Sequence, residues 1–183
     1  MNTTELERDI KKELRASMNG ILSARMREAG MPFKLIFGVE LPRLQSIACE
    51  FPKDAALANQ LWSQNIRETK LLAIMLMPPE AFTPEEANRW SKTMVTAEEA
   101  QVMAMVLLSK TKQAKEVCMA WLAAGEPLPS TCASLCLCHL LLQGIELCTK
   151  EKQVIAQRTT QMMPSANLHL KKAIQALEEK LKK

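Results

Sequence analysis

The sequence predicts an all-α protein, a right-handed α-solenoid in which pairs of helices stack one after another. Four helix-start signals recur at intervals of 31, 34 and 35 residues, at Asn65, Thr96, Ser130 and Ser165. Each opens a strongly apolar helix, and more amphipathic segments fill the gaps at 84–94, 112–124 and roughly 145–160. A two-helix unit with this period is typical of a solenoid, because each unit buries its inner helix against its neighbours. The composition agrees, since five Gly, no Tyr and twelve Met favour helices over strands.

The central inner helix is predicted within Leu61–Met77. Asn65 is placed to accept the backbone N–H of Glu68, and the Glu68 carboxylate to reach back, which is a reciprocal cap at the usual spacing. The run 71–77 has no polar face and is too short to span a membrane, which indicates a buried core helix. The Pro-Pro pair that follows ends the helix, because neither residue donates the next helical hydrogen bond.

The N-terminal part is predicted as helices over about 4–29, followed by a connector at 31–41 and helical repeats over about 42–183. Thr4 and Glu7 are the predicted cap of the first helix. Its apolar stripe consists of Leu6, Ile10 and Leu14. The connector has Pro and Gly near its ends and no helical stripe, so we expect an extended, partly buried segment.

Residues 1–183 are predicted to form a single domain, long enough to bury a substantial core. The first residues are charged, and no apolar run reaches about 18 residues, so we expect neither a signal peptide nor a membrane span. Four of the six Cys lie in or beside helical runs, which is typical of small buried side chains in a reducing compartment. We therefore expect a cytoplasmic protein.

The formal net charge is +4, and most of the excess lies in the last helix, where residues 165–183 hold five basic and two acidic side chains. This excess suits an acidic partner such as nucleic acid. Lysines near a helix C-terminus also complement the helix dipole and keep the end of a solenoid soluble. Both interpretations remain open.

The densest cluster of metal-ligand types is Cys132, Cys136 and His139, on one face of a helix. These side chains suit a thiophilic ion such as zinc. A fourth ligand is missing, however, and the surrounding leucines favour a core helix, so we predict no metal site. The five scattered glycines match no phosphate-binding loop, so we also predict no cofactor.

Glu98 and Glu99 are the candidate catalytic carboxylates, at the start of an inner helix. Capping explains Glu99 without a catalytic role. The three tryptophans, Trp62, Trp90 and Trp121, suit stacking against bases. We expect at least two of them to be core residues instead.

Six basic residues near the ends of inner helices are the candidate contacts to a nucleic-acid backbone: Arg67, Lys70, Lys110, Lys112, Lys171 and Lys172. The inner helices of a solenoid line its concave face, where such charges form a stripe that binds phosphates. An ordinary solvated surface explains the same residues equally well.

Three groups of residues occur in the order found in one known family. They are Gly38-Val39 with Pro42, Leu44 and Ile47-Ala48; Leu61-Trp62 with Arg67-Glu68 and Leu72-Ala73; and Lys172-Ala173-Ile174. Over roughly residues 36–182 the sequence resembles the DNA alkylation repair family, the AlkD-like HEAT-repeat DNA glycosylases. The resemblance implies a concave, basic solenoid of HEAT-like helix pairs that grips duplex DNA and hydrolyses the N-glycosidic bond of alkylated purines.

The same resemblance implies an active site of an Asp, two Trp and an Arg, and this sequence does not match it. The tryptophan-aspartate motif falls on 98–103, with Met103 in the aspartate position. The arginine position falls near Thr131 and the later tryptophan near Ala176. A thioether does not stabilise an oxocarbenium ion or orient water as a carboxylate does.

Three hypotheses of function follow. We expect a non-catalytic or diverged member of this family that holds DNA, such as double-stranded DNA, or another polyanion on its concave face. An alternative is an active alkylpurine DNA glycosylase that uses Glu98 or Glu99. A further alternative is a protein–protein adaptor without a nucleic-acid partner, which the low net charge permits.

Overall fold

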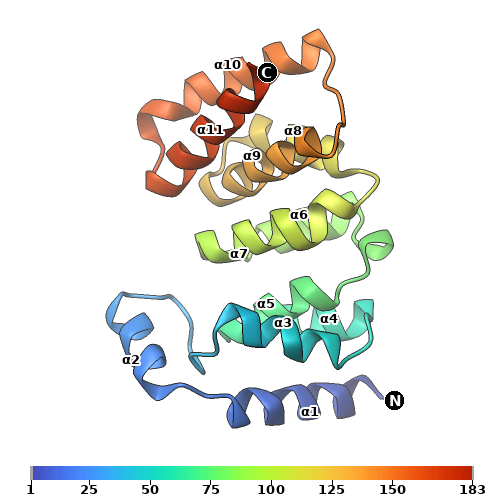
Figure 1. Cartoon of the computed structure of the whole chain (residues 1–183), viewed down its shortest axis with the longest axis vertical. Coiled ribbons are helices and arrows are strands. Elements are labelled where there is room, and N and C mark those ends of the chain that lie inside the picture. Colours follow the sequence, from blue (N-terminus) through green and yellow to red (C-terminus); the bar gives the residue numbers. More distant parts are fainter. Residues whose placement is uncertain (1, 183) are drawn as a thin grey trace. The chain divides into compact units, whose positions relative to one another are not determined.

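The computed structural model describes residues 2–182, and this part of the chain is all-α, as predicted (Figure 1). Over these residues it consists of eleven α-helices and a few short turns, with one isolated β-bridge between Leu35 and Ile66. No described helix is long and apolar enough to cross a membrane. The chain divides into two compact units, Met1–Ala81 (unit 1) and Phe82–Lys183 (unit 2). The single continuous domain stays a prediction.

Unit 1 contains α1 (Thr3–Ala16), α2 (Gly20–Glu28), α3 (Leu41–Cys49), α4 (Ala55–Trp62) and α5 (Arg67–Leu76), and ends with a 3₁₀ turn at Pro79–Ala81. α5 packs against α3 and α4, and α4 also packs against α1. Every residue of α5 is buried, as its apolar run predicts. The stripe of α1 is buried as well. The connector, residues 31–40, is extended and buries Phe33, Ile36, Phe37 and Val39.

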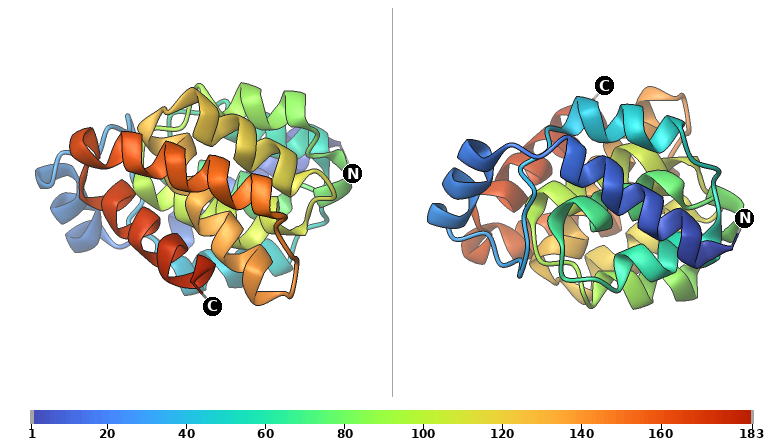
Figure 2. Two further views of the ribbon diagram at one scale, coloured as in Figure 1. Left: turned by 90° about the horizontal axis from the view of Figure 1, so that it is seen from above. Right: turned by 90° about the horizontal axis from the view of Figure 1, so that it is seen from below.

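Unit 2 contains α6 (Pro84–Ser91), α7 (Ala97–Val102), α8 (Ala114–Ala124), α9 (Pro127–Leu142), α10 (Thr149–Met162) and α11 (Leu168–Leu181), with a 3₁₀ turn at Met163–Ser165. Its helices form two layers. α6, α8 and α10 pack in series, and so do α7, α9 and α11. The layers meet where α8 packs on α9 and where α10 lies beside α11 (Figure 2). α9 is surrounded by α7, α8 and α11, which is why its sequence is apolar on nearly every side.

All three tryptophans are core residues. The Phe82 and Trp90 rings meet edge to face, with centroids 5.2 Å apart. Trp121 Nε1 donates to Asn88 Oδ1 at 3.0 Å and so ties α8 to α6. The expectation of core anchors rather than stacking platforms is confirmed.

The helix start predicted at Thr96 is confirmed, because Thr96 caps α7. Four others are wrong, one of them at Asn65, which does not cap α5. Asn2, not Thr4, caps α1, and Asn167, not Ser165, caps α11. α9 already begins at Pro127, whose fixed φ suits a first helical position, so Ser130 lies inside the helix.

The inner helix predicted after Thr96 is not a continuous α-helix. α7 is followed by a π-helical turn at Met103–Leu107 and a 3₁₀ turn at Leu108–Lys110. A π turn carries one residue more per hydrogen-bonded ring than an α turn. The periodicity of the sequence does not reveal it, because every residue from Val102 to Leu108 is apolar.

The corrected cap of α11 is testable by two alanine substitutions. Asn167 Oδ1 accepts the backbone N–H of Leu170 at 2.9 Å, whereas the Ser165 hydroxyl donates to the Met162 carbonyl at 3.3 Å. We expect Asn167→Ala to lower the free energy of unfolding by about 1 kcal/mol, because it removes the cap. Ser165→Ala is the matched control, with an expected change below about 0.5 kcal/mol. Urea denaturation measures both, and a larger loss for Ser165→Ala would contradict the assignment.

Candidate nucleic-acid interface

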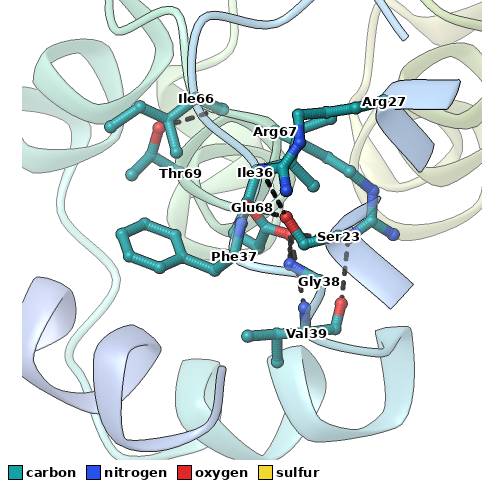
Figure 3. A network of polar contacts seen from close by, with 10 residues as sticks. All are labelled: Ser23, Arg27, Ile36, Phe37, Gly38, Val39, Ile66, Arg67, Glu68 and Thr69. Atoms are coloured by element: carbon teal, nitrogen blue, oxygen red, sulfur yellow. Dashed lines mark hydrogen bonds and ion pairs between the residues drawn. The ribbon is translucent and has the colours of Figure 1, made fainter. Parts of the chain in front are cut away.

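The start of α5 holds the connector through two buried charged side chains (Figure 3). The Glu68 carboxylate accepts the backbone N–H groups of Phe37 at 3.0 Å, Gly38 at 2.9 Å and Val39 at 3.3 Å. Arg67 Nη1 donates to the Val39 carbonyl and to Glu68 Oε1, both at 2.9 Å. The extended backbone, which lacks a continuous strand partner, is thereby hydrogen-bonded in the core.

The predicted reciprocal cap between Asn65 and Glu68 is wrong. Ile66 occupies the N-cap position of α5 and makes no side-chain cap. Asn65 Oδ1 instead accepts the backbone N–H of Lys34 at 3.1 Å. The Asn65 and Glu68 oxygens both accept N–H groups of the connector. Buried N–H groups of the connector need a partner within the protein, whereas N–H groups at an exposed helix end can bond to water.

Gly38 is required where the connector passes α2. Its φ is +76°, and a Cβ there would lie 2.3 Å from the Asn19 carbonyl oxygen and 2.6 Å from the Ser23 nitrogen. The Ser23 hydroxyl donates to the Ile36 carbonyl at 2.6 Å. The start of α2 is thus fixed to the same stretch of connector that Glu68 holds.

Arg67 and Lys70 are not surface residues, which corrects their prediction as phosphate contacts. Arg67 is 2% and Lys70 6% exposed. Arg67 donates a hydrogen bond to the Val39 carbonyl of the connector. Lys70 Nζ lies over the Trp62 ring, 4.5 Å from its centroid. Both charges therefore have roles inside the protein.

The four remaining candidates are exposed lysines of unit 2. Lys110 and Lys112 lie just before α8, and Lys171 and Lys172 lie on α11. The opposite side of α11 is buried through Leu170, Ala173, Ile174 and Leu177. None of the four lysines forms an ion pair within residues 2–182.

Lys115, close to two of these lysines, is already paired. Its Nζ lies 2.9 Å from Glu151 Oε1 and ties α8 to α10. The hydrogen bond from Lys115, with help from the backbone N–H of Cys148, holds the pKa of Glu151 below its usual range. Lys110 and Lys112, just before α8, differ from Lys115 in that they have no acidic partner among the described residues.

A second basic group lies in unit 1 and was not predicted. Residues 15–34 carry four exposed basic side chains and one acidic one, Glu28. The basic residues are Arg15, Arg25, Arg27 and Lys34. A count over the first 50 residues hides this group, because eight basic residues there are balanced by seven acidic ones. Counting charges in shorter windows would have found it.

The candidate catalytic carboxylates lie in the first turn of α7. Glu99 is buried, and its Oε2 accepts the backbone N–H groups of Val95 and Thr96, both at 2.7 Å, so its predicted capping role is confirmed. Glu98, in the same turn, is half-buried. Met103 is fully buried at the start of the π turn.

The structure brings Cys132 and Cys136 together in the core between α8 and α9. Burial, with a smaller contribution from Cys136, raises the pKa of the Cys132 thiol well above its usual range. No group of three or more His, Cys, Asp or Glu in the described part of the chain is arranged to hold a metal ion.

The model of the family described as DNA alkylation repair enzyme matches residues 10–174. The chain belongs to this family. A solved structure with 18% sequence identity covers 95% of the chain and 74% of its own length, with a TM-score of 0.80. That protein represents a family related to the HEAT-like repeat DNA glycosylases, with affinity for branched DNA structures. The likeness confirms the predicted HEAT-like helix-pair fold. No curated protein sequence matches the chain.

The role of Glu68 in holding the connector gives a stability prediction. In Glu68→Gln the amide NH₂ must face backbone N–H donors, and Arg67 loses its buried counter-charge. We expect the free energy of unfolding to fall by about 3 kcal/mol, measured by urea denaturation. Glu50→Gln is the control, since Glu50 is exposed and lies 3.6 Å from Arg43. Glu50→Gln should lower the free energy of unfolding by less than about 1 kcal/mol. Equal effects of the two substitutions would refute the structural role of Glu68.

Proposed function

We propose that this chain is a DNA-binding member of the DNA alkylation repair family that does not hydrolyse the N-glycosidic bond. The observation that carries the proposal is the set of four exposed lysines without an ion pair among the described residues: Lys110, Lys112, Lys171 and Lys172. They lie on a fold shared with relatives of DNA glycosylases. A lysine with no acidic partner on its own protein is available to a phosphate.

The proposed loss of catalysis is supported by the residues that the sequence resemblance matches with the family's active site. The reaction develops positive charge on the sugar, which a nearby carboxylate stabilises. Met103 offers a buried thioether instead. Thr131 is buried, and its hydroxyl donates to the Pro127 carbonyl at 2.7 Å. Glu99 is engaged in the cap of α7, which leaves Glu98 as the one candidate acid of this turn without that role.

The form of DNA is also part of the proposal. The solved structure that the chain resembles represents proteins with affinity for branched DNA structures. We extend this affinity to the present chain, in addition to binding of linear duplex. The low overall charge of +4 is consistent with phosphate contacts confined to a few lysines.

The lysine assignment is testable through the salt dependence of binding to linear duplex DNA. Removing a phosphate contact lowers the slope of log K against log salt by about 0.9 per contact. We expect Lys110→Gln with Lys112→Gln, and separately Lys171→Gln with Lys172→Gln, to weaken binding and flatten this slope in fluorescence-anisotropy titrations. Lys53→Gln with Lys92→Gln is the control of equal charge, since both residues are exposed. A slope that falls only in the control pair would reject the assignment.

The absence of catalysis is testable on duplex DNA that contains 7-methylguanine. We expect no free base above the level released without protein, measured by chromatography. Base release that disappears in Glu98→Gln would instead establish a diverged glycosylase. Glu98→Gln is the cleaner variant, because Glu99→Gln also disturbs the cap of α7. If neither base release nor DNA binding at low salt is found, the protein–protein adaptor becomes the better hypothesis.

A further inference from the structure

α2 is a nine-residue helix that buries a single residue, Ser23. Polar contacts hold it in unit 1. The Asn19 side chain caps it through the Leu22 N–H at 3.0 Å, and the Asn19 N–H donates to the Phe37 carbonyl at 3.0 Å. The views of Figures 1 and 2 place α2 at the outer margin of unit 1, past the end of α1. A helix attached in this way leaves most of its surface to a partner.

Two large apolar side chains lie at the start of this helix, in water. Ile21 is 72% and Met18 60% exposed. They are three residues apart, across the N-terminal end of α2. Of the large hydrophobic side chains described in unit 1, only Leu35 is also exposed. Two large apolar side chains exposed within one helical turn of sequence, on an otherwise polar surface, point to a contact site.

Arginines flank this apolar pair. Arg25 follows Ile21 by one helical turn and therefore lies on the same face of α2. Arg15 lies in the last turn of α1. Both are exposed, and neither has an ion pair within the described residues. The net charge of residues 15–34 is +3, so the surface around the apolar pair is basic.

This combination fits DNA in which a base pair is open to solvent. Exposed Ile and Met side chains of DNA-binding proteins lie against base steps, while arginines hold the adjoining phosphates. In an intact duplex the bases are stacked, and insertion of a side chain must first unstack them. At a branch point the terminal base pair of each arm is already accessible, so this cost falls. The apolar pair therefore favours branched over linear DNA.

We infer that α2 is the element that contacts the branch point of branched DNA. Met18 and Ile21 lie against the exposed base pair, and Arg15 and Arg25 bind the phosphates beside it. The inference rests on the proposed DNA-binding function and adds the residues that select the branched form.

The test compares a three-way junction with a linear duplex of the same total number of base pairs, by fluorescence anisotropy at one salt concentration. We expect the unsubstituted chain to bind the junction about tenfold more tightly than the duplex. In Met18→Ser with Ile21→Ser this preference should fall to about twofold or less, while the Kd for the duplex stays unchanged. Both side chains are exposed, so the variant should keep its thermal unfolding midpoint. Leu142→Ser, an equally exposed apolar residue of unit 2, is the control and should keep the preference.

Arg25→Gln provides a second variant with a different physical basis. It should weaken binding to the junction more than to the duplex, and the difference should shrink as salt is raised. A preference for the junction that survives in both variants would overturn the inference, as would an unsubstituted chain that binds both DNAs equally. Self-association that depends on Met18 and Ile21, found by sedimentation while the junction preference persists, would assign the apolar pair to a protein contact. Absence of binding to either DNA would overturn the proposed function itself.

Discussion

The buried carboxylate of Glu68 is the interaction on which unit 1 depends. A stretch of extended chain between helices has backbone N–H groups that no helix or sheet satisfies, and here three of them converge on one side chain. Arg67 neutralises that carboxylate and takes the neighbouring carbonyl. The same stretch of connector then fixes α2 through Ser23 and Asn19. The buried Glu68 carboxylate thus fixes the connector, and the connector fixes the exposed helix α2. The stability of the core is thereby linked to the surface that we assign to DNA.

The sequence predicts the helices well, because the signals that form them are local. Apolar runs identify α5 and α9, and the pairing of Thr96 with Glu99 is a contact within one turn. Several features that it does not predict depend on partners far along the chain. Asn65 has the right spacing to cap α5, yet its oxygen is taken by Lys34. Arg67 and Lys70 begin a helix where exposed charges are common, and only the three-dimensional packing reveals that they are buried.

The candidate DNA contacts also differ in how far the sequence alone predicts them. Lys171 and Lys172 are predictable as exposed, since the apolar residues of α11 define its buried side. The basic group around α2 is visible only when charge is counted over a few turns, because the acidic residues of α1 mask it in a longer count. Family membership adds the fold, but the chemistry of the reaction lies in a few side chains. The fold and the reaction therefore have to be considered separately.

The π-helical turn at Met103–Leu107 changes how this chain should be compared with its relatives. Each residue of an α-helix advances the direction of the side chains by about 100°. A π turn accommodates one additional residue, so the positions that follow are rotated by about that angle relative to an uninterrupted helix. Where a relative has an uninterrupted α-helix, residue counting from α7 into the next turn would therefore equate side chains that point in different directions. Superposition of backbone atoms avoids this error, and it is the proper basis for asking which side chain occupies the place of a catalytic residue.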